Sequence, residues 1–316
     1  MPDKPPYSLC AKSFAKGFKH AGFYTEKAYS SELDNEKVLE FNPDIIMCFN
    51  FSELNEGFLN KVFEKNKNCI FIFNFLTELK SKNDSENVKK LEAFEGKKVI
   101  LTADKSNLKI LPNATYIPNG INHRQYKSKY KGYTNGITVM SNPNNTNVLK
   151  IITNLIVEFG KINFYSDEFD YLNSLDNELW KTIDDTEINK LYRESYSGDI
   201  ISEKERSLTI STSFINVVPK TQTKIGVDFR ILEVCASSSF VICEENNEIK
   251  RLFETGKEIE TYTNVEELVD KIKFYLKKPA IARYISDNGR GAIVNNHPIE
   301  DRIKRIINII KKEYDI

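Results

Sequence analysis

Short apolar runs alternate with amphipathic stretches through the first third of the chain. The runs predict buried strands, and the stretches between them carry apolar residues at helical spacing. We expect strands at 45–51, 69–75, 98–102 and 114–117, and helices at 13–21 and 53–65. A parallel sheet flanked by helices gives this pattern. No clear strand precedes the first helix, so either the sequence given begins after that strand or residues 7–10 form a very short one.

A second series of the same kind follows the turn signal Pro118-Asn119-Gly120 and a basic, tyrosine-rich segment at 124–133. Its strands are expected at 137–140, 161–165, 214–218 and 240–243, and its helices at 148–159, 187–196, 229–236, 265–276 and 281–293. We therefore predict two α/β domains, at 1–125 and 126–298, with a closing helix at 299–316. Open parallel sheets bind ligands beyond the carboxyl ends of their strands, which places the expected site in the cleft between the domains.

The composition fits a globular protein without a broad affinity for nucleic acid. The chain has 316 residues, 40% of them hydrophobic, and its 45 basic residues balance 45 acidic ones. This apolar content excludes a disordered chain, and zero formal net charge leaves only local patches for binding phosphates. No stretch approaches the roughly 18–20 apolar residues of a membrane-spanning helix, and the polar start is unlike a signal peptide. We expect a cytoplasmic protein.

Cysteine and histidine usage argues against disulfides and against a metal site. The five cysteines are odd in number and lie mostly in apolar runs, which predicts reduced thiols in the core. Three histidines, no Cys-x-x-Cys pair and no Asp-x-Asp triplet leave few candidate metal ligands. We therefore expect neither a metal nor another cofactor.

The most informative segment is 226–242. Asp228 suits the N-cap of a helix that ends at Ala236, and a Ser-rich turn and a buried strand follow. Arg230 and Glu233 share a face near the helix N-terminus, where free N–H groups favour an anion. A nucleoside diphosphate suits this group, because Arg binds phosphate and a carboxylate accepts hydrogen bonds from two sugar hydroxyls. An Arg/Glu pair on a solvated helix face explains the same residues.

An ordered set of motifs in this region resembles the C-terminal domain of CgeB-like glycosyltransferases, of the glycosyl transferases group 1 family with the GT-B fold. The resemblance covers about 226–307, and 114–121 is similar to the segment that closes the N-terminal domain in this superfamily. The matching positions are Gly226-x-x-x-Arg230-x-x-Glu233, Phe240-Val241-Ile242, Glu248-Ile249, Leu252-Phe253, Gly256-Lys257-Glu258-Ile259, Tyr262, Glu266-Glu267-Leu268, His297 and Arg302.

The resemblance implies a GT-B-like fold, with two Rossmann-like domains facing each other across a cleft. It implies an enzyme of the hexosyltransferase type that takes a nucleoside-diphosphate sugar as its donor. The carboxylate matching Glu233 binds the ribose in such enzymes, and Arg230 would steady the diphosphate without a metal. The N-terminal domain would then lie on the acceptor side, and the C-terminal domain would hold the donor.

The closing helix has an apolar face bordered by basic residues. Ile299, Ile303, Ile306, Ile307 and Ile310 share one side of it. In proteins of the GT-B fold the last helix often crosses back to the first domain, so we expect packing there. Peripheral contact with a membrane surface is the alternative, because an amphipathic basic helix also suits that role.

Further donor-site candidates follow from their expected places in the fold. Asp228 and Gly226 accompany the donor helix. The loop after the first strand of the second domain would border the phosphates or the transferred sugar, and Tyr192 lies on a helix leading towards the cleft. The candidates for donor binding are therefore Arg230, Glu233, Asp228, Gly226, Ser141, Asn142 and Tyr192.

A catalytic base, if the reaction needs one, is expected from a loop of the N-terminal domain. Asp104 and Glu78 each follow a predicted strand there. A helix cap or a solvated surface residue explains either of them as well, so the catalytic residue is left unassigned.

Two positions depart from the family pattern. Ile225 stands where many retaining enzymes carry a second Glu, so retention or inversion at the anomeric carbon is left open. Ser238 replaces the usual Gly after the donor helix, which costs strain if that position needs a positive φ. Because of these departures, two alternatives to a glycosyltransferase stay open. One is a nucleotide-sugar epimerase, and the other is a catalytically silent nucleotide-binding module.

The acceptor is not identified by the sequence, and a glycan, a protein, a lipid and a nucleic acid are all open. The segment 124–133 interleaves cations with aromatic residues, a pattern that suits base stacking or an acidic acceptor. A solvated linker between domains has the same composition.

Overall fold

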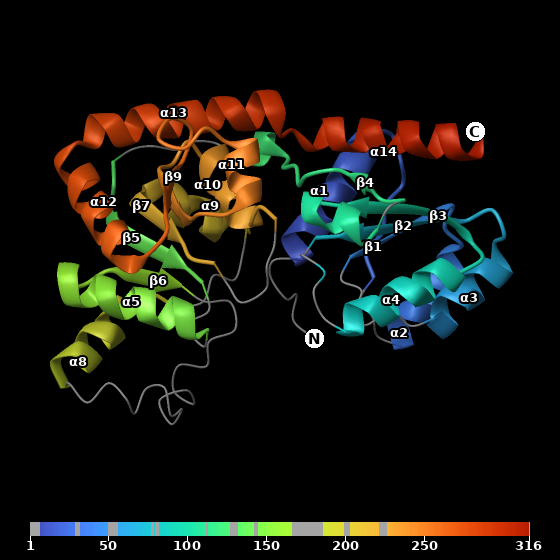
Figure 1. Cartoon of the computed structure of the whole chain (residues 1–316), viewed down its shortest axis with the longest axis horizontal. Helices are drawn as coiled ribbons and strands as arrows, with labels where there is room; N and C mark the ends of the chain where they lie inside the picture. The colour runs from blue at the N-terminus through green and yellow to red at the C-terminus, as the bar shows by residue number, and fades with distance from the viewer. Residues whose placement is uncertain are drawn as a thin grey trace. The chain divides into compact units, whose positions relative to one another are not determined.

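The computed structural model describes residues 7–28, 32–49, 56–76, 79, 82–111, 113–126, 132–141, 145–165, 186–198, 203–220 and 226–315. The chain forms two compact units, shown in Figure 1. Unit 1 consists of Met1–Asn122, Ile225–Val227 and Pro298–Ile316, and unit 2 consists of His123–Lys224 and Asp228–His297. The chain passes into unit 2 close to the boundary expected at 125, and it returns to unit 1 for its last helix.

Unit 1 is built on a four-stranded parallel sheet. Its strands are β1 (Ile45–Phe49), β2 (Ile70–Phe75), β3 (Lys97–Thr102) and β4 (Thr115–Tyr116), in the order β1-β2-β3-β4. Every residue of β2 is buried, as the continuous apolar run predicts. Phe71, Phe73 and Phe75 pack with apolar side chains of α2 (Glu32–Phe41), α3 (Glu56–Lys65) and α4 (Lys82–Ala93) on one face of the sheet (Figure 1).

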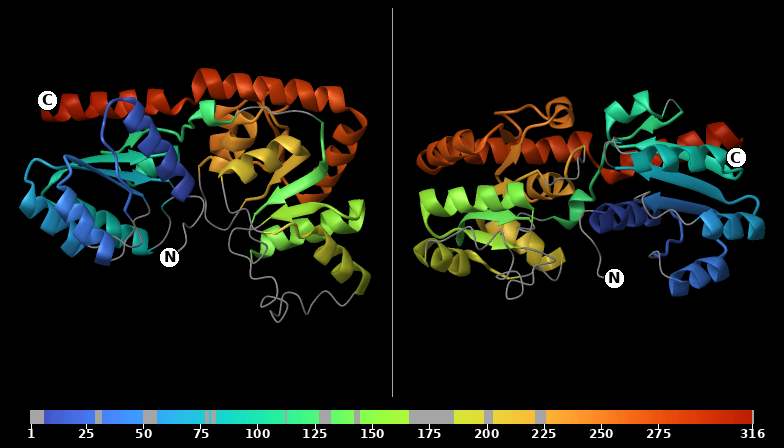
Figure 2. Two further views of the ribbon diagram at one scale, coloured as in Figure 1. Left: turned by 180° about the vertical axis from the view of Figure 1, so that it is seen from behind. Right: turned by 60° about the horizontal axis from the view of Figure 1, so that its bottom comes forward.

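The first and last helices of the chain pack together in unit 1, where Figure 2 shows them next to the sheet. They are α1 (Tyr7–His20) and α14 (Ile299–Tyr314). Gly17 permits their close approach, because a Cβ there would lie 2.9 Å from Cγ1 of Ile303. Residues 7–10 belong to α1, so the alternative of a short strand at these positions is wrong.

The apolar face of α14 is buried in unit 1. Ile299, Ile303, Ile306 and Ile310 are each at most 5% exposed. Arg302 Nε donates to the Pro118 carbonyl at 2.9 Å, which ties the helix to the chain after β4. The face that a membrane-surface helix would offer to lipid is therefore covered by the protein. Within the described part of the chain, none of the helices is long and apolar enough to span a membrane.

Unit 2 is built on a five-stranded parallel sheet with the order β6-β5-β7-β8-β9. The strands are β5 (Asn135–Met140), β6 (Asn163–Tyr165), β7 (Ser213–Val218), β8 (Val241–Glu244) and β9 (Glu260–Tyr262). From β5 the chain adds β6 on one side of that strand. It then adds β7, β8 and β9 in turn on the other side, so the strand order reverses between β5 and β7. Right-handed crossovers then put the helices after β5 and β7 on opposite faces, which opens a crevice between these two strands at their carboxyl ends.

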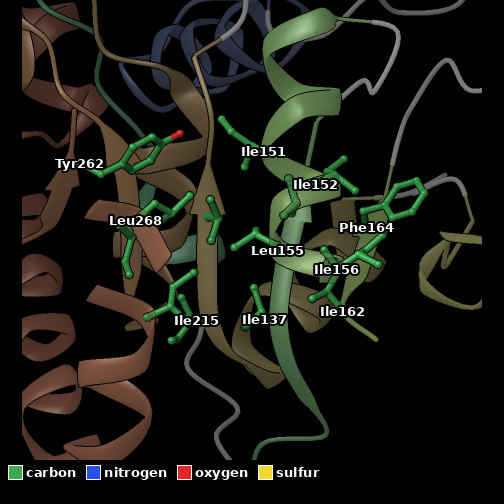
Figure 3. Close-up of a cluster of buried hydrophobic side chains, with 14 of the residues drawn as sticks. Ile137, Ile151, Ile152, Leu155, Ile156, Ile162, Phe164, Ile215, Tyr262 and Leu268 are labelled. Carbon is green, nitrogen blue, oxygen red and sulfur yellow. The ribbon is translucent and has the colours of Figure 1, made fainter. Parts of the chain in front are cut away.

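The helices of unit 2 enclose its sheet. They are α5 (Thr146–Phe159), α8 (Thr186–Ser195), α9 (Glu203–Thr212), α10 (Phe229–Ala236), α11 (Asn247–Leu252), α12 (Val265–Lys277) and α13 (Pro279–Asn296), with the short 3-10 turn η3 (His123–Gln125). Figure 3 shows the core, in which Ile152 and Leu155 of α5 pack towards Ile137 of β5. The helical spacing of apolar residues in α5 supplies this buried stripe.

The cysteines are core residues, as the sequence predicts. All five are free thiols, four of them are buried and Cys48 is half-buried. Burial raises the pKa of Cys48, Cys69 and Cys235 to about 12, so these thiols stay protonated and unreactive at neutral pH.

Candidate functional site

Arg230 lies at the carboxyl ends of β5 and β7 in unit 2. Its Nη1 donates to the Met140 carbonyl at 2.5 Å, and its Nη2 donates to the Pro219 carbonyl at 3.3 Å. Met140 ends β5 and Pro219 follows β7, so one guanidinium joins the two strands where the strand order reverses. This is the part of an open parallel sheet where ligands bind.

Asp228 holds Arg230 in that position. The carboxylate caps α10 by accepting from the Arg230 backbone N–H at 2.9 Å, and it also accepts from Nε at 3.0 Å and Nη2 at 2.6 Å. Burial alone would raise the pKa of the Asp228 carboxyl, but the adjacent Arg230 charge and its hydrogen bonds hold that pKa below the usual value. The pair is therefore ionised at neutral pH.

These contacts change the role expected for Arg230. Nε, Nη1 and Nη2 all donate to protein groups, whereas the sequence suggested a guanidinium held ready for a diphosphate. The alternative of a solvated Arg/Glu face is wrong, because Arg230 is 8% exposed and Glu233 is 1% exposed. The main role of Arg230 in this structure is to fix the carboxyl edge of the sheet to α10.

Glu233 lies on the next turn of α10 and has a partner that sequence reasoning missed. Tyr126 donates its hydroxyl to Glu233 Oε1 at 2.9 Å, across 107 residues of sequence. Tyr126 follows η3 and is 8% exposed. The sequence placed it in a segment of exposed, stacking aromatics, but its ring is buried and its hydroxyl points at the candidate ribose-binding carboxylate.

Two buried hydroxyls at the carboxyl edge have no hydrogen-bond partner among the described residues. One is Ser141 Oγ, directly after β5, and the other is the hydroxyl of Tyr262, the last residue of β9. Buried hydroxyls normally find a partner, so an unpartnered one marks a place where a ligand or water can bind. Ser141 thus keeps the place expected for it, whereas Asn142 lies outside the described residues.

The rim of the same edge is polar and linked by hydrogen bonds. Asn147, in the first turn of α5, donates its side-chain amide to the Lys220 carbonyl at 3.1 Å and to Glu244 Oε2 at 3.0 Å. The Lys220 backbone N–H donates to the same carboxylate oxygen at 3.3 Å. Lys220, which follows β7, and Glu244, which ends β8, are therefore tied to the start of α5.

Gly226 is assigned to unit 1 and has backbone contacts there. Its N–H donates to the Leu76 carbonyl at 3.5 Å, just after β2, and the amide of Asn119 donates to the Val227 carbonyl at 3.3 Å. These bonds give Gly226 a role in anchoring its segment to unit 1.

Tyr192 is a core residue, so its assignment to the donor site needs correction. Its side chain is fully buried, its hydroxyl donates to the Leu149 carbonyl at 3.2 Å, and its ring packs against Phe164. The residue therefore fastens α8 to α5 and offers no surface to a ligand.

Of the two candidates for a catalytic base, the structure describes Asp104 only. Asp104 caps the short 3-10 helix η2 (Lys105–Lys109), because its carboxylate accepts from the N–H of Ser106 at 2.9 Å and from its hydroxyl at 2.6 Å. This is the capping role that the sequence also allowed. Glu78 lies outside the described residues.

The turn after α10 has the strain that the sequence anticipated. Ser238 has a φ of 54°, in the left-handed region that favours glycine. We expect Ser238→Gly to raise the free energy of unfolding by about 0.5–1 kcal/mol, because relief of this strain exceeds the entropy lost by glycine. Urea denaturation of the full chain measures the change.

Ser237 gives the matched control for that substitution. It has a φ of −87°, and its hydroxyl donates to the Glu233 carbonyl at 2.9 Å. Ser237→Gly should therefore lower the free energy of unfolding by about 1 kcal/mol. Equal losses at both positions would show that Ser238 carries no backbone strain.

Comparison with known proteins supports a functional interpretation of this region. The sequence model of a family described as glycosyl transferase-like matches residues 175–308, a stretch that includes α10 with Arg230 and Glu233. Among curated proteins, none matches the sequence.

Solved structures of glycosyltransferases share the fold over nearly the whole chain. HepE from Anabaena, crystallised with UDP and glucose, covers 98% of this chain and 97% of its own, at 14% identity and a TM-score of 0.71. A glycosyltransferase from Rickettsia africae covers 96% and 94%, at 13% identity and a TM-score of 0.65. Sucrose-phosphate synthase from Thermosynechococcus elongatus covers 97% and 94%, at 11% identity and a TM-score of 0.67. The two parallel sheets with their helices are thus Rossmann-like units, and the chain has the GT-B fold.

Proposed function

We propose that the chain is a glycosyltransferase that transfers a sugar from a nucleoside-diphosphate sugar to an acceptor. The observation that carries the proposal is the position of Glu233, buried on the helix that begins at the carboxyl edge of the unit 2 sheet, inside the stretch matched by the family model. The fold shared with HepE, which was crystallised with UDP and glucose, supports the same class of donor.

Each described donor-site residue has a role in this proposal. Glu233 accepts hydrogen bonds from the ribose hydroxyls, and the Ser141 hydroxyl donates to a phosphate or to the transferred sugar. Asp228 and Arg230 hold the end of β5, the segment after β7 and the start of α10 in one arrangement. The Arg230 charge also contributes to the potential felt by the diphosphate, although its hydrogen bonds go to the protein.

The chemistry needs stabilisation of the leaving group. The bond between the anomeric carbon and the diphosphate oxygen breaks, an acceptor oxygen bonds to that carbon, and the acceptor proton passes to a base. Positive charge and N–H groups at a helix N-terminus stabilise the diphosphate as it leaves, so we propose a reaction that needs no metal. The base is unassigned, because Asp104 caps η2 and Glu78 lies outside the described residues.

The finer assignments rest on the order of the sequence motifs. We propose a hexosyltransferase in the CgeB-like branch, because the motif positions from Gly226 to Arg302 follow one another as in that branch. The acceptor is a glycan, protein, lipid or nucleic acid.

Nucleotide binding tests the proposal. We expect one of UDP, GDP, CDP, dTDP and ADP to bind saturably in isothermal titration calorimetry, and binding should persist in EDTA. Glu233→Ala should weaken it by at least ~1.5 kcal/mol, or about tenfold in Kd, because a hydrogen bond to a charged group is lost.

Glu260→Ala is the matched control for Glu233→Ala. It also removes a buried carboxylate of unit 2, but Glu260 contacts Lys271 and Tyr275 and none of the proposed donor-site residues in the bonds described. This variant should bind the nucleotide as the wild type does at temperatures where it is folded. No binding by the wild type, or equal weakening in both variants, would contradict the donor site. Nucleotide binding without sugar transfer would identify a catalytically silent module. Turnover of the nucleotide sugar without an acceptor would identify an epimerase.

A further inference from the structure

The segment that opens unit 2 is fastened to α10 by two side chains. Tyr126 donates to Glu233 Oε1, and Arg290 of α13 donates both to the His123 carbonyl, at 3.2 Å, and to the Ala236 carbonyl. The segment from His123 to Tyr126 is therefore held beside the very turn of α10 that carries Glu233. A contact between a buried tyrosine hydroxyl and a buried carboxylate is directional, so it fixes how that carboxylate is rotated.

From this geometry we infer that Tyr126 is a positioning residue for donor recognition, which orients the Glu233 carboxylate towards the ribose hydroxyls. The inference rests on the proposed function. Tyr126 does not touch the donor in this account. The residue is 8% exposed, which leaves too little surface for stacking on a base, and its hydroxyl donates to Glu233.

The chemistry of a ribose explains why such a residue is needed. A carboxylate that accepts from the 2′- and 3′-hydroxyls together must turn both of its oxygens towards them, because both bonds are directional. A glutamate side chain has several rotatable bonds, and each undefined rotation lowers the fraction of molecules ready to bind. The hydroxyl of Tyr126 removes that freedom before the donor arrives, so its effect should depend on whether the ligand has the 2′-hydroxyl.

The experiment compares ribose and deoxyribose ligands. Calorimetry gives Kd for the tightest binder among UDP, GDP, CDP and ADP and for its 2′-deoxy form, with wild type, Tyr126→Phe and Tyr275→Phe. We expect Tyr126→Phe to weaken binding of the ribonucleotide about tenfold and to weaken the deoxy form much less. The ratio of the Kd of the deoxy form to the Kd of the ribonucleotide should therefore fall towards one.

Tyr275→Phe is the matched control, because Tyr275 also donates its hydroxyl to a buried carboxylate in unit 2, that of Glu260. It should leave the ratio at its wild-type value, and thermal melting identifies any variant that has lost its fold. A double variant of Tyr126→Phe with Glu233→Ala should bind no more weakly than Glu233→Ala alone, since Tyr126 acts through that carboxylate.

The outcomes separate the inference from the proposed function. If the wild type binds and Glu233→Ala weakens binding as expected, but Tyr126→Phe keeps the wild-type ratio, the inference is wrong and the proposed function stands. An equal fall of the ratio in Tyr275→Phe would also overturn the inference, because loss of any buried tyrosine hydroxyl in unit 2 would then have the same effect. If the wild type binds none of the nucleotides, the inference and the proposed function are both wrong.

Discussion

Replacing Asp228 with alanine is expected to lower the free energy of unfolding by about 3–4 kcal/mol. The substitution leaves the buried Arg230 guanidinium without its carboxylate and removes the cap of α10. Removing one member of a buried ion pair is costly, because no water replaces the lost interaction. Urea denaturation of the full chain, followed by circular dichroism, measures the loss.

Two further variants separate the charge from the cap. Asp228→Asn keeps an oxygen that can cap the helix, so it should recover about 1 kcal/mol of the loss. Asp287→Ala breaks another Arg/Asp contact, between Arg283 Nε and Asp287 Oδ2 at 3.3 Å, whose side chains are 42% and 57% exposed. It should cost less than about 0.5 kcal/mol. Equal losses in Asp228→Ala and Asp287→Ala would contradict the structural role of the buried pair.

The Asp228 effect should also depend on pH. The pKa of the Asp228 carboxyl is lowered in the folded protein, so its contribution to stability is complete above the unfolded value, about 3.9, and disappears as the pH falls through the folded value. The difference in stability between wild type and Asp228→Ala should be constant from pH 7 to about pH 5 and should shrink below about pH 4. A difference that grows on acidification would contradict an ionised carboxylate.

Gly289→Ala is expected to lower the free energy of unfolding by about 2–3 kcal/mol. Gly289 lies in α13 where the helix packs on the backbone before β9, and an added Cβ would overlap the Glu258 carbonyl oxygen and lie 3.4 Å from Cys235 Sγ. A backbone oxygen cannot rotate away as a side chain can. Either α13 or the segment before β9 must shift, at a cost greater than the gain in helix propensity, which is at most about 1 kcal/mol.

The same helix provides the control. A Cβ on Gly291 meets no atom within 4 Å, so Gly291→Ala should raise the free energy of unfolding by about 0.5–1 kcal/mol. Denaturation midpoints of the two variants, measured side by side, give the comparison. Stabilisation by both substitutions would show that α13 does not pack closely on the backbone at Glu258.

The sequence predicts the elements whose apolar residues are strongly patterned. The expected helix 229–236 has the bounds of α10, and the helix in the last segment begins at Ile299 as α14 does. No helix was expected at α2 or α9, because their apolar residues do not gather on one face. Strand β9 was not expected either, because its residues Glu-Thr-Tyr form no apolar run.

The candidate site was predictable only where its residues are close in sequence. Asp228 was correctly expected to cap α10, because a cap acts on residues a few positions away. The contacts of Arg230 with the Met140 carbonyl and of Tyr126 with Glu233 cross 90 and 107 residues, and no local pattern encodes them. The same limit applies to Tyr192, whose aromatic side chain fits a core and a ligand site equally well by sequence.

A structure of the chain with its nucleoside-diphosphate sugar tests the central claim most directly. The ligand should be the one that calorimetry selects, and the crystals should contain EDTA. We expect the ribose hydroxyls within hydrogen-bond distance of the Glu233 carboxylate, with the diphosphate beside Ser141 at the carboxyl end of β5. A nucleotide bound elsewhere, or a ribose that makes no contact with Glu233, would contradict the proposed donor site.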